Sequence, residues 1–95
     1  MRVISRRRIR EFSTINSKAE KPLHIWYKLI SKNKFKSFVN LKLFFPSIDL
    51  VGKFVVFNIG GNKFRLIAAI HFNTQMVFIR HIFTHADYDK KKWRE

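Results

Sequence analysis

The spacing of apolar residues predicts helices in the first half of the chain. Ile9 and Phe12 lie three positions apart among arginines, which is typical of a short amphipathic helix over residues 6–15. The capping-box pattern Ser17-Lys-Ala-Glu20 predicts the start of a second helix. Its apolar positions follow the i, i+3, i+4, i+7 spacing of one helix face: Leu23, Trp26, Tyr27 and Ile30. A third, shorter helix is predicted over about 38–45, where a proline would end it.

The second half of the chain is rich in β-branched and aromatic residues and predicts three strands. We expect them at residues 53–59, 63–72 and 75–84. Gly60-Gly61 and the two-residue loop Asn73-Thr74 are the predicted turns, and a final helix over 85–93 would have Thr84 as its N-cap. Residues 2–5 fit either a short strand or the lead into a helix. Helices followed by an antiparallel meander indicate the α+β class.

The predicted loop fixes which side chains of the last two strands share a face. If Asn73-Thr74 forms the loop, paired positions sum to about 147. Arg65 then faces Ile82 and Arg80 faces Ile67, so the arginines are diagonal neighbours about 7–8 Å apart on one face. The other face is apolar and should pack on the helices: Phe64, Leu66, Ala68, Ile70, Phe72, Gln75, Val77, Ile79, His81 and Phe83.

Two like charges side by side repel each other, so we expect an anion to bind the arginine face. A loop at Gly60-Gly61 would add Phe54, Val56 and Asn58 to that face. The alternative is that both arginines extend into water or pair with carboxylates near the C-terminal helix.

Composition points to the kind of partner. The 95 residues fit one domain over 1–95, and twenty Lys and Arg against six Asp and Glu give a formal charge of +14. Such an excess implies an anionic partner, with RNA as the leading candidate. Cysteine is absent, which excludes disulfides and thiolate chemistry. The first residues are too polar for a signal peptide and no apolar run would span a membrane, so a cytoplasmic protein is expected.

Four stretches of this sequence together resemble the HigB-type toxins of bacterial toxin–antitoxin modules. They are residues 19–28, 45–52, 55–67 and 79–89, which include Asn58-Ile-Gly-Gly-Asn-Lys-Phe-Arg65 and Thr84-His-Ala-Asp-Tyr-Asp89. The resemblance implies a RelE-like fold, with two N-terminal helices packed on a twisted antiparallel sheet and a short C-terminal helix. It also implies an mRNA interferase that acts in the ribosomal A site, and a helix-turn-helix antitoxin similar to HigA. The chain departs from the expected pattern at His81 and Phe83, and in its basic tail at 90–93.

The residues of the arginine face suit RNA cleavage without a metal or cofactor. That reaction uses the 2′-hydroxyl of the substrate as nucleophile and needs proton transfer and charge neutralisation. Arg65 and Arg80 suit the phosphate, and His85 suits proton transfer because an unperturbed imidazole has a pKa of about 6.5. His85 could instead be an ordinary residue of a helix N-terminus. His81 and His85 have no carboxylate cluster beside them, so no metal site is expected.

Further contacts to RNA are expected from lysines and from polar or aromatic residues near the arginines. The candidates are Lys36, Lys53, Asn58, Lys63 and Tyr88. Tyr88 could orient the ribose, stack on a base, or be a plain core aromatic. His71 is a weaker candidate, and His24 is interpreted as structural. The alternative function is a non-catalytic basic module that binds RNA or DNA, with salt-sensitive binding and no scission.

Overall fold

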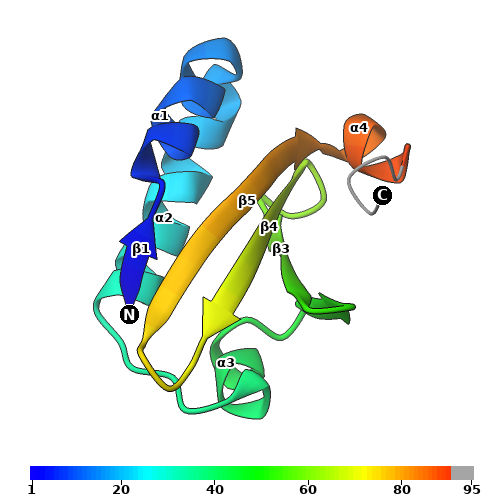
Figure 1. Cartoon of the computed structure of the whole chain (residues 1–95). Helices are drawn as coiled ribbons and strands as arrows, with labels where there is room; N and C mark the ends of the chain where they lie inside the picture. The colour runs from blue at the N-terminus through cyan, green and yellow to red at the C-terminus, as the bar shows by residue number, and fades with distance from the viewer. Residues whose placement is uncertain (91–95) are drawn as a thin grey trace.

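The computed structural model describes residues 1–90, which fold as an α+β protein (Figure 1). The elements in chain order are β1 (Arg2–Ile4), α1 (Arg6–Ile15), the 3-10 helix η1 (Ser17–Ala19), α2 (Glu20–Ser31), α3 (Phe38–Phe44), β2 (Asp49–Val51), β3 (Phe54–Ile59), β4 (Phe64–His71), β5 (Met76–Thr84) and α4 (His85–Asp89). Within these residues, no helix is both long and apolar enough to cross a membrane. The helix expected over 85–93 ends at Asp89, and the last part of that prediction lies outside the described residues.

The sheet is mixed and has five strands: the three that were predicted, β1 where residues 2–5 were left open between a strand and the lead into a helix, and the unexpected β2. Its strand order is β1-β5-β4-β3-β2, with β1 parallel to β5 and the other neighbours antiparallel. The expectation of a wholly antiparallel sheet is therefore wrong at β1. It is also incomplete at β2, where a loop was expected. Residues 49–51 pair with β3 through a tight turn at Gly52, whose φ of 59° suits glycine.

The core lies between the sheet and the helices α1 and α2, which pack on one of its faces (Figure 1). The predicted face of α2 is confirmed: Leu23, Trp26 and Ile30 are buried. The Trp26 ring lies 5.4 Å from that of Phe57 in β3. From α1, Phe12 packs edge-on against Phe64 with 5.6 Å between ring centroids. These aromatic contacts fix the helices on the sheet and leave its other face to the candidate site.

The capping box expected at the start of α2 does not form. Ser17 lies in η1, and neither Asn16 before η1 nor Ala19 before α2 caps its helix with a side chain. Backbone bonding replaces the box, because the Ala19 N–H donates to the Asn16 carbonyl at 2.9 Å. Pro22 fits in the first turn of α2 and lies against Gly60, where an added Cβ would stand 3.3 Å from the proline Cγ. Gly60 also has a φ of 62°, which favours glycine. Both its backbone conformation and its closeness to Pro22 of α2 therefore select a residue without a side chain.

A β-bulge divides the β4–β5 ribbon, and only the half before it follows the predicted register. The pairs from His71↔Met76 to Ala68↔Ile79 keep the expected sum. Beyond the bulge, Ile67 pairs with His81 and Arg65 with Phe83, so Arg80 is the extra residue. The predicted partners of Arg65 and Arg80 are therefore wrong. The shift turns Ile82 towards the helices, and it turns His81 and Phe83 to the opposite face, contrary to the prediction.

Candidate active site

The sheet face turned away from α1 and α2 carries most of the predicted site, and we call it the site face. Its central residues are Val56 and Asn58 from β3, Arg65 and Ile67 from β4, and His81 and Phe83 from β5. The predicted addition of β3 is confirmed, because Asn58 pairs with Arg65 and Val56 with Ile67. Val56 and Ile67 are buried in a small apolar cluster with Phe54, Phe83 and Tyr88 packed against it. The site face therefore has a rigid apolar floor.

Arg65 is a buried cation at one end of this floor. The residue is only 9% exposed, and its Nη1 donates a hydrogen bond to the Phe64 carbonyl at 3.1 Å. The guanidinium carbon lies 5.6 Å from the centre of the Tyr88 ring. Among the ion pairs of residues 1–90 there is none to Arg65. Burying a charge without a counter-charge is costly, so the fold maintains a cation here that could bind an anion.

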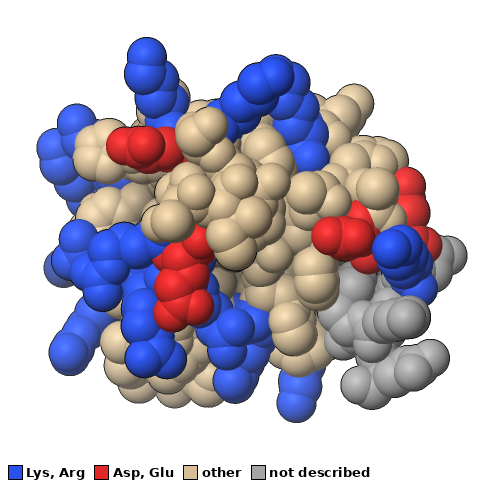
Figure 2. Space-filling model, turned by 90° about the horizontal axis from the view of Figure 1, so that it is seen from above, with Lys and Arg blue, Asp and Glu red and all other residues tan. Residues whose placement is uncertain are grey.

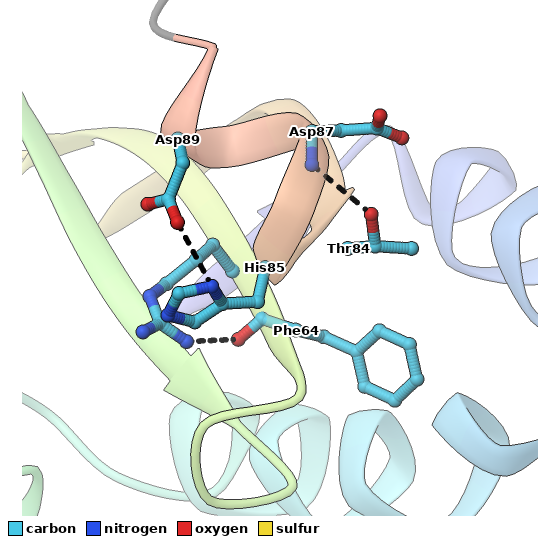
Figure 3. A network of polar contacts seen from close by, with 6 residues as sticks. Phe64, Thr84, His85, Asp87 and Asp89 are labelled. Carbon is cyan, nitrogen blue, oxygen red and sulfur yellow. Dashed lines mark hydrogen bonds and ion pairs between the residues drawn. The ribbon is translucent and has the colours of Figure 1, made fainter.

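The short helix α4 brings His85 next to the start of β4. The Thr84 hydroxyl accepts a hydrogen bond from the Asp87 backbone N–H at 3.2 Å, which confirms the predicted N-cap (Figure 3). The backbone N–H of His85 donates to the Lys63 carbonyl at 3.0 Å. Because Lys63 is two residues before Arg65, this bond ties the histidine to the strand that carries the arginine.

Asp89 pairs with His85, a contact that the sequence prediction missed. The Nδ1 of His85 lies 3.1 Å from an oxygen of Asp89, one helical turn on (Figure 3). With its proton on Nδ1, the imidazole donates to the carboxylate, and Nε2 remains to exchange a proton. The two side chains are 49% and 60% exposed. The i, i+4 spacing of a histidine and an aspartate in a predicted helix was the available signal.

Arg80 lies on the site face, as predicted, but the bulge moves it away from the diagonal position beside Arg65. Its guanidinium carbon is 6.0 Å from the ring centre of Phe78, which pairs with Ala69 on the site face. Arg80 is three residues before Phe83, the partner of Arg65, which is roughly 10 Å along the strand. Arg65 contacts Tyr88 beyond the end of β5, whereas Arg80 contacts Phe78 near its start. The two guanidinium groups thus point towards opposite ends of the ribbon.

His81 joins the site face because of the bulge. Its ring stacks on Phe83 with 5.2 Å between centroids and 15° between planes. Burial of the ring lowers the pKa of His81, and the nearby charges of Arg8 and Arg80 lower it further. The available signal was the spacing of the apolar residues in β5. Val77, Ile79 and Ile82 face the core, and a step of three breaks the alternation of a regular strand.

The remaining predicted RNA contacts lie at different places. Lys63 lies in the turn beside His85 and is exposed. The Nζ of Lys53 lies 5.7 Å from the ring centre of Phe54, at the edge of the site face. Lys36 is far from both. It follows Phe35, which is hydrogen-bonded to Gln75 at the β4–β5 hairpin tip, the opposite end of the ribbon from α4.

The other histidines do not join the group around Arg65. His71 is exposed and packs against Phe78, with 5.1 Å between ring centroids. His24 is exposed on α2, on the helical side of the sheet. Residues 1–90 contain no group of three or more His, Cys, Asp or Glu side chains placed to hold a metal ion.

Comparison with known proteins identifies a family over most of the chain. A family model for the HigB toxin, described as the RelE-like toxic component of a toxin–antitoxin system, matches residues 19–91. The mRNA interferase toxin HigB of Escherichia coli K12 is 43% identical over 63 residues, 63% of this chain and 61% of that protein. The mRNA interferase HigB of Escherichia coli O6:H1 (strain CFT073) is 37% identical over 71 residues, 72% of this chain and 69% of that protein. The first match therefore spans less than two thirds of the length of that relative.

Proposed function

Since this chain belongs to the HigB family of RelE-like toxins, we propose that it is an mRNA interferase, the endoribonuclease of a toxin–antitoxin module. Relatives at 37–43% identity are named mRNA interferases. The observation that carries the proposal is the buried guanidinium of Arg65, which has no ion pair within residues 1–90 and lies beside Tyr88 and α4. A buried cation without a counter-charge destabilises the fold, but it can stabilise the negative charge of a bound oxyanion.

In the proposed reaction the 2′-oxygen of the substrate attacks the adjacent phosphorus. The bond from the 2′-oxygen to phosphorus forms while the bond to the 5′-oxygen breaks, leaving a 2′,3′-cyclic phosphate and a 5′-hydroxyl. The 2′-hydroxyl gives up one proton and the leaving 5′-oxygen takes up one. Arg65 stabilises the charge on the phosphorane oxygens. His85 exchanges a proton through Nε2, while Asp89 holds its Nδ1.

Arg80 is proposed to bind a different phosphate of the same strand. Arg80 lies away from Arg65 along β5 and contacts Phe78. This position suits binding of a neighbouring phosphate along the RNA backbone better than binding of the scissile phosphate together with Arg65. Lys63 and Asn58 would contact the strand near the cut, and Tyr88 would pack against the ribose or a base. Lys53 would add charge at the edge of the site face, whereas Lys36 is too remote to contact the same nucleotides.

The finer parts of the proposal concern the setting in the cell. We expect cleavage of message in the ribosomal A site in the cytoplasm, and a HigA-like helix-turn-helix antitoxin that neutralises the toxin. The shallow, exposed position of His85 and Asp89 supports a role for the ribosome, because a second surface would be needed to enclose the reacting bond.

The test is induction of the chain in bacteria without an antitoxin, followed by mapping of RNA ends. The proposal predicts growth arrest and new 5′ ends within translated messages. Arg65→Ala and His85→Ala should each remove both effects, with Lys32→Ala as a control, since Lys32 is exposed at the end of α2, outside the site face. Full toxicity of folded Arg65→Ala protein would refute the assigned site. Salt-sensitive RNA binding without any new ends would favour the non-catalytic alternative.

A further inference from the structure

A cavity between α1 and α2 gathers cations on the helical side of the molecule. It has a volume of about 610 Å³, and its lining includes Arg6, Arg10, Ser13, Glu20, His24 and Tyr27. In Figure 2 the blue Lys and Arg side chains crowd the side on which Figure 1 places α1 and α2, with few red ones among them. This cavity is separate from the candidate active site, which lies on the opposite face of the sheet.

Folding alone does not explain the two arginines of the cavity. Arg6 and Arg10 are four residues apart on α1, where like charges destabilise a helix. Neither arginine takes part in the ion pairs of residues 1–90. The nearby Glu11 of α1 pairs with Arg7 instead. Arg6 instead stacks over Tyr27, with 4.5 Å from its guanidinium carbon to the ring centre. A guanidinium that stacks on an aromatic ring is held in place and keeps its in-plane N–H donors for an anion.

A second observation also indicates a ligand. The Ser13 hydroxyl oxygen is buried and has no hydrogen-bond partner within residues 1–90. Ser13 also lines the same cavity, so rotation of its side chain towards the cavity would let a bound anion accept its proton. Glu20 is the acidic residue of the lining, so the two arginines still leave a net positive charge. The family match begins at residue 19, so the arginines of α1 lie outside the matched segment.

We propose that this cavity binds a backbone phosphate of RNA through Arg6 and Arg10, as a docking site remote from the cut. The fork-shaped donors of the two arginines suit phosphate oxygens, and the Ser13 hydroxyl adds a neutral donor. The choice of RNA among polyanions rests on the proposed function; the anion site itself does not. The site anchors one part of a folded RNA while the opposite face of the sheet acts on a single strand.

The test measures binding of a short 2′-O-methyl RNA hairpin to the purified full chain by fluorescence anisotropy, at several salt concentrations. Blocking the 2′-hydroxyl prevents cleavage, so binding is read without activity. Arg6→Gln/Arg10→Gln should weaken binding by about tenfold or more and reduce the slope of log affinity against log salt by about 1. Arg2→Gln/Arg7→Gln removes the same charge from exposed positions that do not line the cavity, and should change both much less.

Two further comparisons make the outcome decisive. Glu20→Gln should tighten binding, because it removes the carboxylate of the lining. Equal losses in the two double variants would show a diffuse charge effect and overturn the inference, as would no binding by the wild-type chain. Displacement of the hairpin from this site by polyglutamate at equal charge would overturn the assignment to RNA. Binding through Arg6 and Arg10 by a chain that cuts no message would refute the proposed function alone.

Discussion

Replacing Arg65 with methionine should stabilise the fold while it removes activity. Methionine keeps an unbranched stem over the apolar cluster but has no charge to desolvate. With the residue only 9% exposed, burial of the guanidinium costs several kcal/mol. Against this stand the hydrogen bond from the charged guanidinium to the Phe64 carbonyl, worth about 1.5–3 kcal/mol, and the contact with Tyr88, worth about 0.5–2 kcal/mol. Replacing buried charged groups by apolar side chains of similar volume is often neutral or stabilising by about 1–4 kcal/mol, so we expect a gain at the low end, about 1 kcal/mol in the free energy of unfolding.

Urea denaturation and thermal unfolding of the purified chain measure this gain. For a domain of this size each kcal/mol raises Tm by about 4–8 °C. Arg80→Met is the matched control, because Arg80 is exposed and its replacement should change stability by less than about 0.5 kcal/mol. RNA cleavage by Arg65→Met should fall by about a hundredfold or more. A clear loss of stability in Arg65→Met would show that the arginine is a structural support for α4, and the account of a cation maintained for function would be wrong.

Three more predictions follow from single contacts. Asp89→Asn should leave the fold intact and shift the neutral tautomer of His85 away from Nδ1–H, which ¹⁵N NMR measures. The pH profile of cleavage should change as well. An unchanged tautomer would contradict the orienting role of Asp89. Because the folded-state pKa of His81 is lowered, the unfolded chain binds more protons, so the stability that its neutral form supplies is present above about pH 6.5 and is lost as pH falls. In urea titrations between about pH 7 and pH 5, the free energy of unfolding of His81→Gln should fall less steeply than that of the wild-type chain. An equally steep fall in both proteins would contradict this prediction. Gly60→Ala should lower the free energy of unfolding by about 1 kcal/mol or more, through its positive φ and its contact with Pro22, and wild-type stability would contradict this.

Much of the fold follows from local patterns that the sequence shows. The spacing of Leu23, Trp26 and Ile30 predicted the buried face of α2, and the alternation after Gly52 predicted β3, β4 and β5. The two edge strands did not follow from a periodicity: a strand at residues 2–5 was one of two alternatives, and β2 was expected to be a loop. Each has three residues, too few to show a periodicity, and β1 depends on a parallel partner more than seventy residues away.

The placement of the candidate residues on the sheet was predicted only in part. The face shared by Arg65, Asn58 and Val56 follows from the β3–β4 turn and was correct. The diagonal contact of Arg65 with Arg80 was wrong, because the β-bulge after Ile79 inserts one residue and changes the pairing of the rest of β5. The alternation of core-facing and outward-facing residues looks regular within each half of β5. The bulge shows only when the core-facing positions of the two halves are compared.

The chemical nature of the cut ends tests the central claim most directly. A translated message cut by the wild-type chain would be isolated, and the 3′ end of its upstream fragment identified by mass spectrometry. Attack by the neighbouring 2′-hydroxyl, with Arg65 on the phosphate and His85 moving the proton, predicts a 2′,3′-cyclic phosphate and a downstream 5′-hydroxyl. A free 3′-hydroxyl with a downstream 5′-phosphate would mean that water or another nucleophile attacks, and would contradict the account.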